Sequence, residues 1–267
     1  LGLQAAMVTK LGDDANACAV IAELEGEGVQ TQLCKKQKGL DTPFTYIIVD
    51  ESSATRTCIH TPIREEVQAS EVCAEWLDDV ALLHSDSRHT RAAITLARLA
   101  VERSIPVVVD AEKPRPHFDE LLPLVDVVCT NSRFPALYAP EKHSLEEQML
   151  SILLAGRAHT VVTTLGAQGS MLLRRASDEG QTVSAAALQQ SPDILSYSEW
   201  KAPGGEGTFH VWRCAAWPPS SIVDPTGALY THTCVCVHVC VGCVCVCVCV
   251  SVCVHVHVYV HVRVCVC

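Results

Sequence analysis

Apolar residues along the first two thirds of the chain follow two alternating periods. Short runs rich in β-branched residues, typical of buried strands, are separated by stretches with an apolar residue every three or four positions, typical of helices. The first pair is AAMVT (5–9) and the helical stretch 14–27, with Asp13 or Asp14 as its cap and Gly26 at its end. Its helical face carries Ala17, Val20, Ile21 and Leu24. This pattern predicts a strand followed by a helix that packs on it.

The same alternation continues through two further units. It predicts strands at residues 80–84, 107–110, 126–130 and 160–164, and helices at residues 90–103 and 145–154. Strands separated by single helices pair in parallel through right-handed crossovers. We therefore predict an α/β fold, a three-layer αβα sandwich with a mainly parallel, doubly wound sheet, whose ligands bind beyond the carboxyl ends of the strands.

Two segments interrupt this rhythm. Residues 42–60 are predicted to form a hairpin around the turn-like residues 51–54, and such a small β structure can act as a lid over a site. Residues 177–207 are rich in Ser, Gln, Gly and Ala with weak periodicity, which predicts a solvated surface loop.

The last residues of the chain follow a different pattern. From Cys234 onward, Val alternates with Cys, His and a few other residues. A repeated GT dinucleotide encodes alternating Cys and Val when it is translated, and one or two base changes in the Cys codon give the other residues. We interpret residues 229–267 as a translated non-coding repeat that follows an incomplete domain, residues 1–228. Other interpretations are a metal-binding strand, which lacks the turns that zinc sites use, and a membrane span, which the length alone would allow. Uncharged, Val-rich segments more often aggregate, so we expect the tail to be insoluble under oxidising conditions.

Composition changes once the tail is set apart. Ten of the 16 cysteines lie in it, and the other six are scattered without a CxxC pair, which favours a reduced, intracellular and cytoplasmic protein. An organelle is an alternative, because a targeting segment would precede Leu1. All 30 acidic residues precede the tail, and this unclustered acidic charge argues against a nucleic-acid partner.

Two turns carry candidate chemistry. Phosphoryl transfer needs backbone N–H groups directed at negative charge, and a helix start preceded by small residues supplies them. DPTGA (224–228) fits the beginning of such an element, and TTLGAQGS (163–170) follows a strand with two glycines that let a nucleotide approach the backbone. Each could also be an ordinary turn, and Walker A spacing is absent.

Seen together, these segments resemble the ribokinase-like (PfkB) carbohydrate kinases, and the ketohexokinase branch most closely. The resemblance runs in order through KLGDD, DTPFTYIIVD with TRTCIHT, VVVDAEKPRP, VVCTN, VTTLGAQG and IVDPTGA, and so covers nearly all of residues 1–228. It implies a parallel αβα sandwich with a β lid, in agreement with the periodicity. It also implies ATP and Mg²⁺ as cofactors, a small-molecule sugar substrate, no membrane partner and a homodimer formed through the lid.

The resemblance also implies roles for individual residues. Those that match nucleotide-binding positions are Arg56, Glu112, Lys113, Arg115, Asn131, Thr164, Gly166, Gly169, Asp224 and Thr226. Gly227 and Ala228 match the start of the anion hole that serves catalysis. Alternative interpretations are a solvated strand charge for Arg56, a turn former for Asn131, a surface loop for residues 112–115, and structural turns for the glycines.

Departures from the family pattern are equally informative. Leu229 and Tyr230 stand where the family has Gly and the catalytic Asp, and a tyrosine with a pKa near ~10 is a poor general base at neutral pH. Phe134 replaces a Glu found in many relatives, so the metal ligands are unknown. We therefore expect an ATP-dependent kinase of a monosaccharide or polyol by descent, truncated at both ends and inactive as written. A noncatalytic pseudokinase and a nucleoside kinase are the alternatives.

Overall fold

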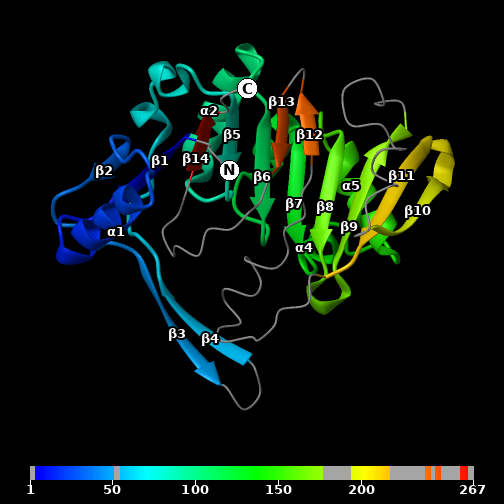
Figure 1. Cartoon of the computed structure of the whole chain (residues 1–267), viewed down its shortest axis with the longest axis horizontal. Coiled ribbons are helices and arrows are strands. Elements are labelled where there is room, and N and C mark those ends of the chain that lie inside the picture. Colours follow the sequence, from blue (N-terminus) through cyan, green and yellow to red (C-terminus); the bar gives the residue numbers. More distant parts are fainter. Residues whose placement is uncertain are drawn as a thin grey trace. The chain divides into compact units, whose positions relative to one another are not determined.

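The computed structural model describes residues 4–50, 55–176, 194–216, 238–241, 244–247 and 259–263. The chain divides into two compact units. The first comprises residues 1–109, 115–124 and 254–267, and the second comprises residues 110–114 and 125–253. Both units combine strands and helices, which confirms the predicted mixed α/β fold class (Figure 1).

The first unit is built on a sheet with strand order β2-β1-β14-β5-β6. Its strands are β1 (Gln4–Leu11), β2 (Cys34–Lys36), β5 (Leu82–Ser85), β6 (Val107–Ala111, of which 107–109 belong to this unit) and β14 (Tyr259–Arg263). Its helices are α1 (Ala15–Gly26), α2 (Thr90–Glu102), α3 (Phe118–Leu121) and the short η1 (Ala69–Glu71), η2 (Ala74–Leu77) and η3 (Leu122–Leu124). β5 pairs in parallel with β6, as predicted, and β1 pairs in parallel with β2, a short strand that the sequence analysis did not predict.

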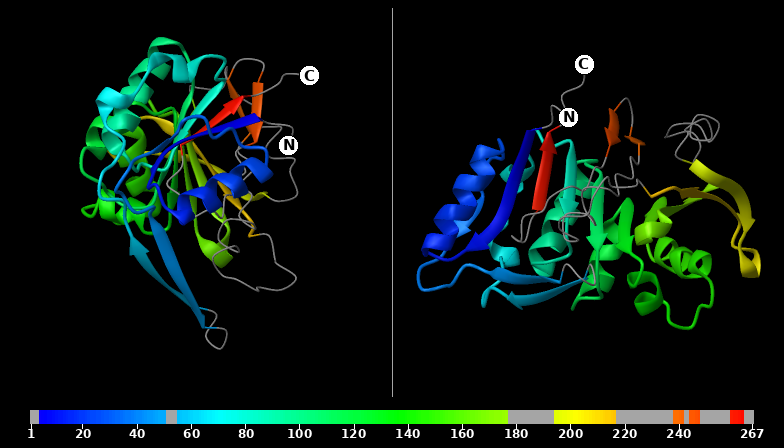
Figure 2. Two further views of the ribbon diagram at one scale, coloured as in Figure 1. Left: turned by 90° about the vertical axis from the view of Figure 1, so that its left-hand side faces the viewer. Right: turned by 60° about the horizontal axis from the view of Figure 1, so that its bottom comes forward.

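Helices cover both faces of this sheet. Figure 2 shows α1 and α2 on opposite sides of the strands, which gives the unit the predicted three layers. The predicted apolar face of α1 is confirmed, because Ala17 and Leu24 pack with Met7 and Leu11 of β1 in one buried cluster. Burial of this cluster is the main favourable contribution to docking the helix on the strand.

One strand of the first unit comes from the far end of the chain. β14 lies between β1 and β5 and pairs antiparallel with both. The backbone N–H and C=O groups of buried strands need hydrogen-bond partners, and β14 provides them for β1 and β5. Two more short strands of the tail, β12 (His238–Val241) and β13 (Val244–Cys247), pair antiparallel with each other in the second unit. The non-coding origin of the tail stays a prediction.

The predicted hairpin is present in the first unit. β3 (Phe44–Asp50) and β4 (Thr55–Thr61) pair antiparallel with Tyr46 opposite Ile59, and they form a sheet of their own. The turn residues 51–54 lie outside the described residues.

The second unit has a sheet with strand order β7-β8-β9-β11-β10. Its elements are β7 (Val127–Asn131), α4 (Phe134–Tyr138), α5 (Leu145–Leu154), β8 (Thr160–Thr164), η4 (Gly166–Gln168), β9 (Ser170–Arg175), β10 (Ile194–Lys201), η6 (Pro203–Gly205) and β11 (Thr208–Cys214). β7 and β8 are parallel, whereas β9, β11 and β10 continue the sheet antiparallel. The core contains the buried residues Met149, Ile152, Val161 and Leu173.

One sequence prediction is wrong in this unit. Residues 194–207 form β10 and a turn, not the predicted surface loop, and residues 177–193 lie outside the described residues. β10 reads ILSYSEWK, with Tyr197 and Trp200 among polar residues. Those two aromatic side chains contact Trp212 and Phe209 of β11, so cross-strand ring packing stabilises a segment whose composition is that of a loop.

Candidate nucleotide site at the strand ends

The carboxyl end of β1 in the first unit is closed by the KLGDD motif. Asp14 caps α1 through the N–H of Ala17 at 2.9 Å. Its carboxylate also accepts the hydroxyl of Thr42 at 2.7 Å and the Thr42 N–H at 2.8 Å. The Thr42 hydroxyl in turn accepts the N–H of Gly12 at 3.0 Å. Asp14 therefore joins the start of α1 to the residue that leads into β3.

These contacts have an electrostatic consequence. The hydroxyl of Thr42, a backbone N–H of the same residue and the cap N–H of Ala17 hold the pKa of Asp14 below its ordinary value, against the opposing effect of partial burial. Gly12 is required at this point, since a Cβ there would collide with the carbonyl oxygen of Leu40 and lie 2.8 Å from the Thr42 nitrogen. Gly12, Asp14 and Thr42 thus form a closely packed junction at the end of β1, which we call the joint.

A buried cationic side chain lies one residue before this joint. Lys10 of β1 is 3% exposed, and its ammonium group forms an ion pair with Glu71 at 2.9 Å and donates to the carbonyl of Glu66. Glu71 also lies 3.8 Å from the ammonium group of Lys35. The pairing tethers η1 to β1 and β2, and removing Glu71 would leave the charge of Lys10 buried and uncompensated.

His89 lies beside this pair and precedes α2. It is 1% exposed, and its Nδ1 accepts the N–H of Val67 at 3.1 Å. Burial is the main reason why the pKa of His89 is lowered to about 4, and the neighbouring charges of Lys10 and Arg88 act in the same direction. The imidazole is therefore neutral at physiological pH. The sequence analysis missed this cluster, although a lysine inside an otherwise apolar strand was a signal for it.

The carboxyl ends of β7 and β8 in the second unit bring together several predicted nucleotide-binding residues. Asn131 and Thr164 are the last residues of these strands and lie opposite each other in the parallel register. The Asn131 amide donates to the carbonyl of Glu112 at 3.0 Å and accepts the N–H groups of Arg133 and Phe134 at 3.0 and 2.9 Å. These contacts agree with the interpretation of Asn131 as a turn former.

The turn after β8 contains two glycines with different surroundings. Gly169 has φ +83°, and a Cβ there would collide with the carbonyl oxygen of Cys214, so it is a packing glycine. Gly166 has φ +59° with no atom within 4 Å of the position of a Cβ. Gly166 alone therefore leaves open space beside the strand end, as close approach of a ligand to the backbone requires.

Two further predicted positions of this unit are exposed or half-buried. Lys113 is exposed and Glu112 is half-buried, so the ammonium group of Lys113 is accessible to a ligand. Phe134, at the position where relatives carry a Glu, is fully buried and stacks on Tyr138 with ring centroids 5.9 Å apart. A buried phenyl ring offers no metal ligand at that position.

The other predicted site residues lie elsewhere. Arg115 belongs to the first unit, where its positive charge helps to lower the pKa of His89. Arg56 lies in β4, and only its backbone is described. The anion-hole segment, with Asp224, Thr226, Gly227, Ala228 and Tyr230, lies outside the described residues. Among residues that the structure does describe, no group of three His, Cys, Asp or Glu side chains is placed to hold a metal ion.

The cysteines that precede the tail are free thiols. Burial raises the pKa of Cys34 to about 12, and it does the same for Cys129. Three others, Cys18, Cys58 and Cys73, are exposed. In the described part of the chain, every helix is too short or too polar to cross a bilayer.

Comparison with known proteins places the chain in a class. The profile of the pfkB family of carbohydrate kinases matches residues 1–192, and the chain belongs to this family. A comparison with curated proteins finds no match.

Solved structures give the same fold at low sequence identity. The chain is similar to adenosine kinase from Sinorhizobium meliloti, with a TM-score of 0.62 and 18% identity over 84% of this chain and 63% of that one. A protein from E. coli described as a ribokinase II, in complex with ATP and Mg²⁺, gives a TM-score of 0.59 and 17% identity over 83% of this chain and 65% of that one. Ribokinase from Giardia lamblia gives a TM-score of 0.54 and 18% identity over 67% of this chain and 62% of that one. The chain thus spans less than two thirds of the length of each.

Proposed function

We propose that this chain derives from an ATP- and Mg²⁺-dependent kinase that transfers the γ-phosphoryl group to a hydroxyl of a monosaccharide or related polyol. The observation that carries the proposal is the open turn at Gly166, which follows β8 at the point where Thr164 lies opposite Asn131, the last residue of the parallel strand β7. Family membership over residues 1–192 supports the same chemistry. The ketohexokinase branch stays a prediction from the sequence motifs.

Two of the described residues, Gly166 and Lys113, are suited to binding a nucleotide. The Gly166 turn would let a polyphosphate or ribose approach the backbone, and the exposed ammonium group of Lys113 would offset negative charge. Mg²⁺, when bound, would neutralise negative charge that develops during phosphoryl transfer. Asn131 would act mainly by fixing the loop at residues 131–134, because its amide is already engaged.

We further propose that the chain as written does not catalyse transfer. Tyr230 occupies the position of the base, and its phenol remains protonated near neutral pH, since its reference pKa is about 10. Leu229 adds a side chain where the backbone must approach a phosphate. The purified chain should therefore form no ADP above the buffer rate with D-fructose, D-ribose or glycerol. Turnover that disappears in Asp224→Ala would refute this.

Binding without catalysis is the second function to test. Calorimetry with ATP and Mg²⁺ should detect a complex if the Gly166 turn is functional. Gly166→Ala should weaken this complex, whereas Gly28→Ala, in the first unit, should not. Binding without turnover would identify a pseudokinase. A nucleoside kinase ancestry is favoured by the similarity to adenosine kinase, and adenosine in the substrate panel tests it.

The homodimer predicted from the resemblance remains a proposal, and the hairpin supports it. Tyr46, Ile48 and Ile59 are 65%, 58% and 52% exposed, and Tyr46 lies edge-on to Phe44 at 5.0 Å. Exposed apolar residues gathered on one surface typically mark an interaction site. Tyr46→Ser with Ile48→Ser should shift the molar mass in light scattering from dimer to monomer. Cys58→Ser, on the opposite strand, is the control, and a monomeric unmodified chain would contradict the proposal.

A further inference from the structure

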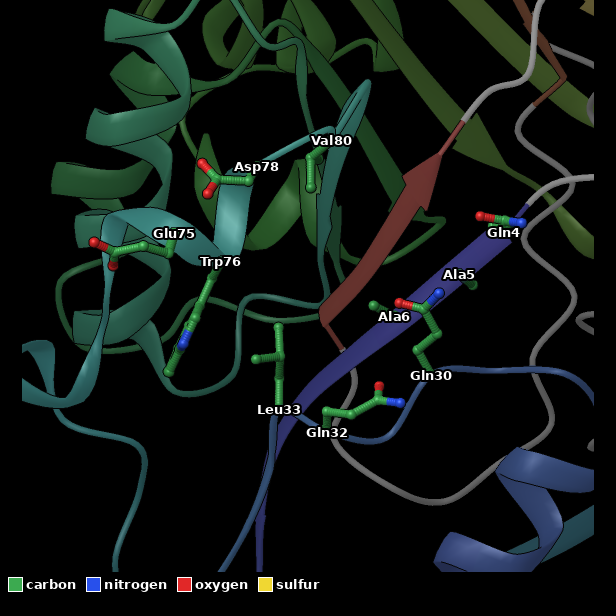
Figure 3. Close-up of a pocket in the computed structure, with 10 residues that line it drawn as sticks. All are labelled: Gln4, Ala5, Ala6, Gln30, Gln32, Leu33, Glu75, Trp76, Asp78 and Val80. Atoms are coloured by element: carbon green, nitrogen blue, oxygen red, sulfur yellow. The ribbon is translucent and has the colours of Figure 1, made fainter.

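The sheets of the two units end in outer strands of different length. The outer strand of the first unit, β2, has three residues, and the segment that leads into it lines a pocket of about 280 Å³ together with β1 (Figure 3). The outer strand of the second unit, β10, has eight residues, and no strand lies beyond it in the described part of the chain (Figure 1). A short edge strand limits pairing with other chains, whereas a long one presents a row of backbone donors and acceptors.

The register of β10 with β11 shows which backbone groups face the outer side. The two strands are antiparallel, and just beyond them the N–H of Ala202 donates to the carbonyl of Gly207 at 3.1 Å. In an antiparallel pair, the residues along one strand alternate between bonding to the neighbour and pointing away from it. Trp200 therefore bonds toward β11, as Ala202 does. The N–H and C=O groups of Glu199 and Lys201 point to the outer side.

The side chains at these two outer positions carry opposite charges. Glu199 and Lys201 are exposed, and their side chains form no ion pair or hydrogen bond with any residue that the structure describes. They share one face of β10, because they are two positions apart. Trp200 lies between them on the other face, half-buried, with its ring centroid 6.1 Å from that of Phe209. Charges of one sign on an edge strand discourage pairing, but a neighbouring pair of opposite charges can be matched by a second strand.

Antiparallel pairing of two β10 strands matches these groups in one register. A two-fold axis at Trp200 places Glu199 of each copy opposite Lys201 of the other, and the backbone groups of both residues already face the new partner. An axis at Glu199 or at Lys201 would instead place like charges opposite each other, which is unfavourable. At the axis, the two Trp200 side chains would meet on the other face as a non-hydrogen-bonded pair, in which side chains lie closest. The edge is thus self-complementary, as a two-fold interface requires.

We propose that the outer edge of β10 binds β10 of a second copy of this chain, antiparallel and with the two-fold axis at Trp200. The interface lies in the second unit, so it is separate from the hairpin of the first unit and requires neither ATP nor a catalytic base. A single strand pair buries less than the ~1,200 Å² of a stable interface, and the contact is therefore weak. We expect it at protein concentrations on the order of 100 µM, above those used in light scattering.

The test uses the full-length chain with Tyr46→Ser and Ile48→Ser, so that the hairpin surface does not contribute. Chains labelled with ¹⁴N and with ¹⁵N are mixed in equal amounts under reducing conditions and treated with a carbodiimide, which joins carboxylates to amines in direct contact. Mass spectrometry should detect a peptide pair of mixed labelling that joins Glu199 to Lys201. Cross-links between these residues only within chains of one label would overturn the proposal.

Charge variants in the same background test the register by sedimentation velocity. Glu199→Lys should weaken self-association by about tenfold or more, because lysines then face each other twice. Adding Lys201→Glu reverses both charges and should restore the affinity to within about twofold.

Glu206→Lys is the matched control, because it changes the net charge equally at an exposed position in the turn after β10, and it should have no effect. Equal affinity of Glu199→Lys and Glu206→Lys, or no recovery in the double variant, would contradict the pairing. So would a monomer at about 500 µM protein. Since no readout needs turnover or nucleotide, failure here is distinct from failure of the proposed kinase ancestry.

Discussion

Two strand ends of this molecule contain motifs of the same family but have opposite local chemistry. At the end of β1, Gly12, Asp14 and Thr42 bond to one another, and no room remains for a Cβ at the glycine. At the end of β8, Gly166 has open space around it. A residue of a motif can therefore serve the packing of the fold or the binding of a ligand. Close packing with satisfied hydrogen bonds indicates the first role, and open space indicates the second.

This contrast also separates residues within one motif. In TTLGAQG, Gly169 packs against the carbonyl of Cys214, while Gly166 three residues earlier meets nothing. Both were predicted to be nucleotide-binding because the resemblance treats the motif as a unit. The variants below test whether substitutions at packed positions lower the stability of the fold and substitutions at open positions weaken ligand binding.

The largest effect is expected at Gly12. Gly12→Ala places a methyl group against the Leu40 carbonyl and the Thr42 nitrogen, so the strand end must move. We expect a loss of more than about 3 kcal/mol in the free energy of unfolding, measured by urea denaturation. The matched control is Gly26→Ala, which has free space and lies in the last turn of α1, where alanine should be neutral or stabilising by up to about 1 kcal/mol. Equal stability of the two variants would show that the joint is not packed.

A somewhat smaller effect is expected at Asp14. Asp14→Ala removes the cap of α1 and two hydrogen bonds to Thr42, which should cost about 2–3 kcal/mol. Asp13→Ala, which removes a single exposed bond to the Gly39 N–H, should cost less than about 1 kcal/mol. Thermal or urea unfolding of both variants measures the difference.

The Asp14 effect should also depend on pH. The folded pKa of Asp14 is lowered, chiefly by the Thr42 hydroxyl, so its contribution to stability is complete above the unfolded value of ~3.9. It is lost as the pH falls through the lower folded value. The stability difference between the unmodified chain and Asp14→Ala should therefore shrink below pH ~3.9. A difference that stays constant down to acid unfolding would contradict the assignment.

The regular elements were predictable because local sequence determines them. The helix at Leu145–Leu154 and the strand at Thr160–Thr164 match the structure residue for residue, and Asp14 is the cap, one of the two residues expected there. β10 was not predictable, because cross-strand ring contacts stabilise it and composition does not report them. The hydrogen bond from the Asn131 amide to the Glu112 carbonyl could not be inferred either, since Glu112 is distant in sequence.

The sequence predicted which residues lie at the strand ends, and their role in nucleotide binding stays a prediction. Asn131 and Thr164 had to end neighbouring parallel strands, and they do. Which glycine is open depends on whether the end of β11 passes beside it, a tertiary contact without a local signal. The buried pair of Lys10 and Glu71 is a similar case, because its two members are far apart in the chain.

An intermediate effect is expected at Asn131. Asn131→Ala removes the bond to the Glu112 carbonyl and the acceptor of the Arg133 and Phe134 N–H groups, which should cost about 1–2 kcal/mol. Asn131→Asp keeps the acceptor for the two N–H groups but loses the donor, so it should restore part of the stability. If ATP affinity, measured by calorimetry, falls in Asn131→Ala and not in Asn131→Asp, the residue acts through the loop. Equal loss in both would indicate direct contact with the nucleotide.

The smallest effect on stability, and the most informative about function, is expected at Gly166. Gly166→Ala costs about 1 kcal/mol, because alanine disfavours positive φ and no neighbour adds a clash. Gly28→Ala is the matched control, with φ +79° and equally empty surroundings in the other unit, so both variants should unfold at similar urea concentrations. Only Gly166→Ala should weaken ATP binding, because only there would the methyl group stand between the backbone and a phosphate. Equal ATP affinity in the two variants would mean that open space at a strand end is not sufficient evidence for a nucleotide site.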